Sequence, residues 1–151
     1  MRRFQFPLER LLWHRQTLEE RAEQALAEAL RREQGLAEEL SRVRGRQEAE
    51  AADVRRALAT PMPGRDMHLH LQFAGALAAR WRLLAAHLQT AQALSAERRA
   101  ALLDRRRNRE VVAQLRTRAL RRYRQAAERE AQKTLDEIAG IRYVHQASQP
   151  G

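Results

Sequence analysis

One short stretch, TPMPGRD at residues 60–66, interrupts a chain whose flanking segments contain no proline for about 50 residues or more on either side. Two prolines and a glycine within four positions cannot continue a helix. On both sides Ala, Arg, Leu, Glu and Gln predominate, and all of these favour helix. We therefore expect a helix at about 4–59, a loop at about 60–66, a helix at about 67–139 and a tail at 140–151.

Apolar or small residues recur in both expected helices, mostly at steps of three, four or seven, which is a heptad-like pattern. In the first helix they are Leu8, Leu11, Leu18, Ala22, Ala25, Ala29, Leu36, Leu40, Val43, Val54 and Leu58. In the second they are Phe73, Leu77, Trp81, Leu84, Leu88 and Ala91. Neither helix can bury such a stripe alone. The pattern therefore predicts an all-α fold of one domain, in which two long helices form an antiparallel coiled-coil hairpin.

The two expected helices differ in length. At 1.5 Å per residue the first spans roughly 75 Å and the second roughly 110 Å. Folding back at the loop places Leu8 opposite about residue 117, so the second helix should overhang beyond about Tyr123. The overhang includes EAQKTLDEIAG, residues 130–140, in which Gly140 is the expected helix stop. Asp66 is the expected N-cap of the second helix.

The net charge of +10 is unevenly distributed. Residues 1–60 contain twelve arginines and eleven acidic residues, whereas residues 98–124 contain eleven arginines and two acidic residues. Such a basic stretch attracts acidic partners and accelerates encounter with them. We define the electrostatic stripe as the last nine of these arginines: Arg105, Arg106, Arg107, Arg109, Arg116, Arg118, Arg121, Arg122 and Arg124.

Several function classes find no support in the sequence. There is no cysteine, no apolar run approaching the ~20 residues that span a bilayer, and no convincing secretory signal, so we expect a cytoplasmic protein. No catalytic constellation or phosphate loop is present, and we expect neither enzymatic activity, nor a cofactor, nor a small-molecule substrate. His68 and His70 are two residues apart, which does not place them on one helix face as a metal site requires.

Two alternatives remain open at this level. A basic helical segment in a chain of pI ≈ 11.4 is typical of nucleic-acid binding, but no known module is present. A basic region normally feeds into a parallel dimeric zipper, which the antiparallel loop forbids. The other alternative is a homodimeric scaffold whose seam completes a four-helix bundle.

Phe73, Leu77 and Trp81 also allow two interpretations. They are either seam residues or a docking patch with aromatic anchors near the loop.

Three motifs of this sequence resemble the conserved motifs of one known protein family. The opening MRRFQFPLERLLWHR is similar to the family's F-x-F-x-L-E-x-L-L followed by a basic residue. LQFAGAL is similar to the start of the family's second helix, and QKTLDEIA to its Q-K-x-x-D-E-x-A. The three motifs occur in the order found in the flagellar export protein FliJ family, and the match extends over almost the full length of the chain.

The resemblance implies a cytoplasmic coiled coil that looks like the central stalk of rotary ATPases and is not itself an enzyme. In the family, the end that carries both termini inserts into the hexameric export ATPase FliI. The hairpin contacts the export gate protein FlhA and helps to deliver substrate chaperones. Injectisome stalk proteins share this plan, so a virulence-type secretion system is a further alternative.

Candidate binding residues follow from the motif matches. The ATPase-binding candidates are Gln132, Lys133, Asp136 and Glu137, together with the apolar Leu135 and Ile138. The gate-binding candidates are Phe73 and Leu77, together with Trp81.

Overall fold

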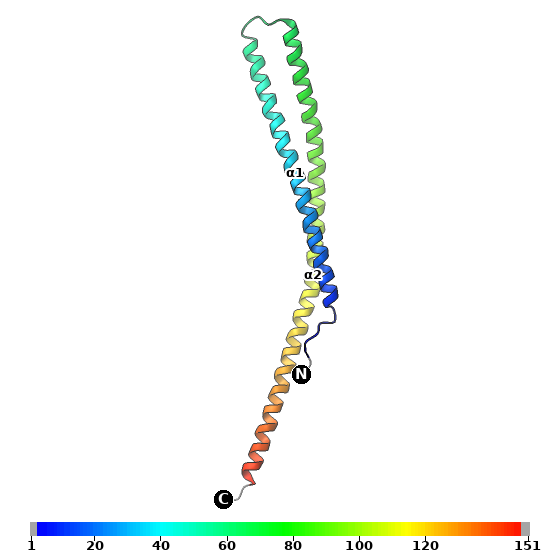
Figure 1. Cartoon of the computed structure of the whole chain (residues 1–151), viewed down its shortest axis with the longest axis vertical. Coiled ribbons are helices and arrows are strands. Elements are labelled where there is room, and N and C mark those ends of the chain that lie inside the picture. The colour runs from blue at the N-terminus through cyan, green and yellow to red at the C-terminus, as the bar shows by residue number, and fades with distance from the viewer. Residues whose placement is uncertain (1–2, 149–151) are drawn as a thin grey trace. The chain divides into compact units, whose positions relative to one another are not determined.

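The computed structural model describes residues 3–148. Over that range it contains two helices, α1 (Glu9–Ala57, 49 residues) and α2 (Gly64–Ala147, 84 residues), and no strand. The two helices run antiparallel and are joined by a short loop (Figure 1). The predicted fold class is confirmed: the chain is an all-α helical hairpin whose second helix is the longer and overhangs at its C-terminal end.

Contacts between residues divide the chain into two compact units, which we describe one at a time. The first unit considered, Glu20–Asp104, contains the loop and the helical segments on either side of it. Its core is a small cluster of Val43, Leu77 and Leu84, against which the partly buried Leu36 and Leu40 pack. Burial of a few large side chains along a narrow seam is what a pair of amphipathic helices allows.

The other unit consists of two segments, one that ends at Glu19 and one that begins at Arg105. Leu12 and Val112 are its buried apolar side chains among the described residues. The rings of Phe4 and Tyr123 have centroids 5.4 Å apart and an interplanar angle of 54°. A tilted aromatic pair of this kind contributes about 0.5–1.5 kcal/mol beyond the area it buries. It therefore fastens the residues that precede α1 to the face of α2.

The start of α1 differs from the prediction, because the helix begins at Glu9 and not near residue 4. Pro7 accounts for the difference. A proline disfavours the helical conformation of the residue before it, here Phe6, so the helix cannot extend further toward the N-terminus. The backbone N–H of Leu12 donates to the carbonyl of Leu8 at 2.9 Å, which closes the first turn.

The bounds of the loop also differ, because α1 ends at Ala57 and α2 begins at Gly64, so the loop comprises residues 58–63. The carbonyl oxygen of Pro63 accepts hydrogen bonds from the backbone N–H groups of Asp66 and Met67, at 3.0 and 3.3 Å. Asp66 therefore lies in the first turn and is not the N-cap. Its carboxylate still stabilises the helix there, because the N-terminal end of a helix dipole attracts negative charge.

The prediction that α2 ends at Gly140 is wrong, since the helix continues to Ala147. A glycine stop requires a left-handed backbone, and none of the glycines in the described part of the chain has a positive φ. Glycine within a helix costs only about 1 kcal/mol relative to alanine. The helical hydrogen bonds of the flanking residues outweigh that cost, and the N–H of Ser148 still donates to the carbonyl of Val144 at 3.1 Å.

Some residues that the heptad pattern assigned to the seam are exposed. In α1 the buried leucine of the first turn is Leu12, whereas Leu11 is 37% exposed. Leu58 lies beyond the end of α1 and is also exposed, as are Phe73 and Trp81 on α2. A helix has 3.6 residues per turn, so a stripe read at strict three and four spacing drifts around the helix and away from its partner.

Candidate partner-binding surfaces

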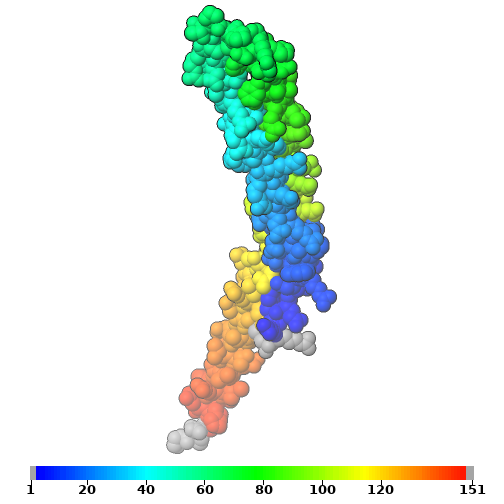
Figure 2. Space-filling view, turned by 45° about the horizontal axis from the view of Figure 1, so that its top comes forward, coloured from blue at the N-terminus to red at the C-terminus, as the bar shows by residue number. Residues whose placement is uncertain are grey.

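The C-terminal part of α2 is bare. Every residue from 128 to 148 is exposed, and we call this stretch the exposed segment. It includes all six ATPase-binding candidates, among which Leu135 is 61% and Ile138 44% exposed. In Figure 2 the orange to red atoms of this stretch have no other described segment over them. The overhang predicted from helix lengths is therefore present in the structure.

The apolar face of the exposed segment continues a face that is covered earlier in α2. Tyr123, Ala127, Ala131, Leu135 and Ile138 follow one another at steps of four, four, four and three, so they lie along one side of the helix. Tyr123 contacts Phe4, and Tyr123 and Ala127 are half-buried, but the later residues of the series have no cover. The stripe thus extends beyond the part of the chain that could bury it.

The polar side chains of the exposed segment are partly organised by the helix itself. The amide Nε2 of Gln132 donates to Oδ1 of Asp136 at 2.9 Å, one helical turn away. This bond holds the carboxylate of Asp136 beside the amide. Lys133 and Glu137 are exposed on the same segment. The segment therefore presents charges of both signs around its apolar stripe.

Apolar side chains continue after Gly140. Ile141, Tyr143 and Val144 are 69%, 75% and 63% exposed. Ile141 and Val144 line a shallow groove on the helix surface together with Glu137 and His145. Exposed aliphatic and aromatic side chains in a row, with no cover from the described chain, mark a surface suited to a protein partner.

The electrostatic stripe is divided by the structure into two sets. Arg109 Nε lies 2.7 Å from Glu19 Oε2, and Arg106 Nε lies 3.3 Å from Glu19 Oε1. Arg116 Nε lies 3.0 Å from Glu9 Oε2. These three arginines bind carboxylates of α1. The remaining six are exposed: Arg105, Arg107, Arg118, Arg121, Arg122 and Arg124.

Glu19 is the most strongly held carboxylate of this region. Its side chain is 12% exposed and faces two guanidinium groups. The hydrogen bond from Arg109 lowers the pKa of Glu19 below its ordinary value, with attraction to Arg109 and Arg106 adding to the effect against the opposing cost of burial. Glu19 is therefore charged at neutral pH and ties α1 to α2.

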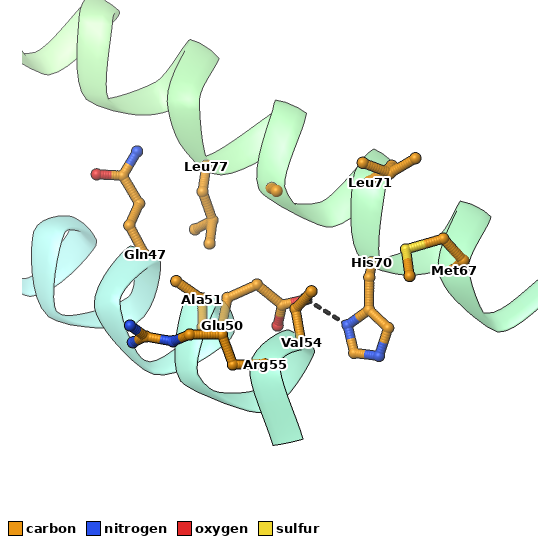
Figure 3. Close-up of a pocket in the computed structure, with 10 residues that line it drawn as sticks. Gln47, Glu50, Ala51, Val54, Arg55, Met67, His70, Leu71 and Leu77 are labelled. Carbon is orange, nitrogen blue, oxygen red and sulfur yellow. Dashed lines mark hydrogen bonds and ion pairs between the residues drawn. The ribbon is translucent and has the colours of Figure 1, made fainter. Parts of the chain in front are cut away.

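The helices near the loop line a pocket of about 430 Å³ that is open to solvent (Figure 3). Its lining is mostly apolar and includes Val54 and Ala51 of α1 and Met67 of α2. His70 reaches from α2 toward α1, where its Nδ1 lies 2.5 Å from Oε1 of Glu50. A polar contact thus replaces a buried apolar layer at this point of the seam, which leaves space between the helices.

The comparison with protein families identifies the chain. The family model described as "Flagellar FliJ protein" matches residues 4–148, almost the entire sequence. The chain belongs to the flagellar FliJ family. FliJ proteins are flagellar export-related coiled-coil proteins, and the helical hairpin agrees with a coiled coil. No curated protein and no solved structure gave a match.

The gate-binding candidates of this FliJ protein are not equally accessible. Phe73 is 49% and Trp81 39% exposed, whereas Leu77 is 6% exposed and belongs to the core cluster with Val43. Phe73 and Trp81 can therefore contact a partner directly, but Leu77 contributes to the hairpin's own stability.

In the described helices, no stretch is long and apolar enough to cross a membrane. Among the same residues, no group of three or more His, Asp or Glu side chains is placed to hold a metal ion.

Two features of these FliJ surfaces were not predicted from the sequence. The first is the continuation of α2 through Ile141 and Val144, which was not predicted because Gly140 was expected to end the helix. The spacing of three from Ile138 to Ile141 and again to Val144 was an available signal. The second is the pairing of Glu19 with Arg109, which are 90 residues apart and whose register only the packed helices define.

Proposed function

We propose that this FliJ protein is a non-catalytic stalk and adaptor of the flagellar protein export apparatus. Its exposed segment enters the central opening of the hexameric export ATPase, and the surface near the loop contacts the export gate protein. In this role it also assists the delivery of substrates and their chaperones. The observation that carries the proposal is the bare apolar stripe of α2 from Ala131 to Ile138, which the chain does not cover.

The dimensions of the exposed segment support an insertion role. A single helix with its side chains is about 10–12 Å across, roughly half the width of two helices side by side. Only the single helix would pass a narrow ring opening, while the paired helices of the hairpin would stop at its mouth. Leu135 and Ile138 would then supply apolar contacts inside the ring, and Lys133 and Glu137 would supply polar ones.

The test is stimulation of ATP hydrolysis by the cognate export ATPase. The full chain should promote ring assembly and ATP turnover, and truncation after Arg129 should abolish both effects. A truncated protein that stimulates as well as the full chain would exclude insertion of the exposed segment. Circular dichroism of the truncated chain should show that the remaining hairpin is folded.

Point variants localise the effect within the segment. Leu135→Ala combined with Ile138→Ala should raise the concentration of FliJ needed for half-maximal stimulation about tenfold or more, since two apolar contacts of about 1–2 kcal/mol each are lost. Leu103→Ala combined with Val111→Ala is the matched control, because these apolar residues of α2 are 48% and 59% exposed and lie outside the exposed segment. Equal effects of both variants would contradict a contact made through the Leu135 and Ile138 face.

A further inference from the structure

Three neighbouring exposed arginines of the stripe lie on the side of α2 that faces away from α1. Residues 111–127 contain five arginines and no acidic residue. At about 100° per residue, Arg118, Arg121 and Arg122 fall within an arc of about 100°. The centre of that arc lies roughly 140° from the half-buried Tyr123 and the buried Val112, which mark the packed side. We call these three residues the outer arginines.

The outer arginines differ from the packed ones in what they contact. Arg109 and Arg116 bind Glu19 and Glu9 of α1. In contrast, over residues 3–148 no ion pair joins an outer arginine to a carboxylate of this chain. Three neighbouring guanidinium groups on an acid-free arc repel one another, and their charge is balanced only by solvent ions. The hairpin's own stability gives no reason for them.

The position of the outer arginines indicates what they meet. They lie on the same helix as the exposed segment, six to ten residues before its first residue, Glu128. Any protein that receives the exposed segment therefore reaches the outer arginines next. Arg109 and Arg116 nearby are tied to α1, whereas the outer arginines are exposed and available to such a protein.

We infer that the outer arginines bind a ring of acidic side chains at the mouth of the protein that receives the exposed segment. This inference rests on the proposed function and names a second contact of the same partner. Among protein side chains, carboxylates fit a planar guanidinium group best, because the guanidinium can donate two parallel hydrogen bonds to the two carboxylate oxygens. Because the outer arginines remain hydrated, the contact acts mainly by steering encounter.

The experiment compares association rates of FliJ variants with the cognate export ATPase, measured by stopped-flow fluorescence at low and high salt. The test variant carries Arg118→Gln, Arg121→Gln and Arg122→Gln. The matched control carries Arg31→Gln, Arg32→Gln and Arg42→Gln, three exposed arginines of α1 that give the same change in net charge. We expect the test variant to associate about tenfold more slowly than the control variant at ~50 mM salt. Near 1 M salt, where charges are screened, the two variants should associate equally fast. The maximal ATPase stimulation by the test variant should be unchanged.

Each result separates the two proposals. If the chain truncated after Arg129, which keeps the outer arginines, stimulates fully, the proposed function fails. If truncation abolishes stimulation but test and control variants show the same rate and salt dependence, only the outer-arginine contact fails. The same variants are tested on vesicles of anionic phospholipid and on a mixed-sequence DNA duplex at ~150 mM salt. Binding there that requires the outer arginines, with unchanged association with the ATPase, would also overturn the inference.

Discussion

The guanidinium Nε of Arg109 lies 2.7 Å from the carboxylate Oε2 of Glu19, although the two residues are 90 positions apart in the chain. Arg106 approaches the other oxygen of the same carboxylate. One acid of α1 thus binds two arginines of α2 on the partly covered side of the stripe. This pairing uses part of the excess positive charge to link the two helices, whereas the outer arginines stay exposed.

Glu19 should make the stability of the hairpin depend on pH. Its pKa is lowered in the folded state, so its contribution is present above the ordinary carboxyl range and is lost as pH falls below about 5 and through the folded pKa. Glu19→Gln should reduce the free energy of unfolding by about 1–3 kcal/mol at pH 7, and the deficit should shrink in acid. Urea titrations at several pH values measure this, with the adjacent, exposed Glu20→Gln as control. A deficit that does not change with pH would contradict the ion pair.

Leu83 and Leu84 are neighbours that should respond very differently to truncation. Leu84 is 5% exposed and belongs to the core cluster, whereas Leu83 is 56% exposed. Leu84→Ala should destabilise the hairpin by about 2–5 kcal/mol because it leaves a cavity in the seam. Leu83→Ala should change stability by about 0.5 kcal/mol or less. Chemical unfolding of both variants decides whether the register of α2 is as described, and equal losses would refute it.

Phe73 and Leu77 should separate binding from stability. Phe73→Ala removes an exposed ring, so it should weaken binding to the export gate protein by about tenfold while the melting temperature is preserved. Leu77→Ala should lower the melting temperature, because Leu77 is buried against α1. Calorimetric binding and thermal unfolding of both variants test this. A stable Phe73→Ala variant with unchanged gate binding would remove Phe73 from the proposed contact.

Gly140 is a site where alanine should strengthen α2. A Cβ added there meets no atom within 4 Å, and the backbone is helical. Gly140→Ala should stabilise the local helix by about 1 kcal/mol, which would slow amide hydrogen exchange at residues 141–147 about fivefold. Ala139→Gly is the reciprocal control and should accelerate exchange by a similar factor. Unchanged exchange in both variants would mean that residues 141–147 are not helical in solution.

Helix identity and hairpin topology were predictable because they rest on local properties of the sequence. The proline and glycine residues of 60–64 prevent any helix from continuing, and the apolar stripes of both helices must be buried. The length difference between the helices then predicted the overhang. Helix ends were less predictable, as Gly140 shows, because a glycine permits a stop without requiring one.

The sequence by itself determined that this chain forms two unequal helices, carries a basic stretch and resembles FliJ along most of its length. Only the tertiary structure decided which side chains are covered. Leu77 is buried in the core and Phe73 is exposed on the surface. Arg109 pairs with Glu19, whereas Arg121 is exposed. The physical reason is that burial and ion pairing depend on the rotation and register of one helix against the other. Residues far apart in the chain set that register together, and no local pattern specifies it.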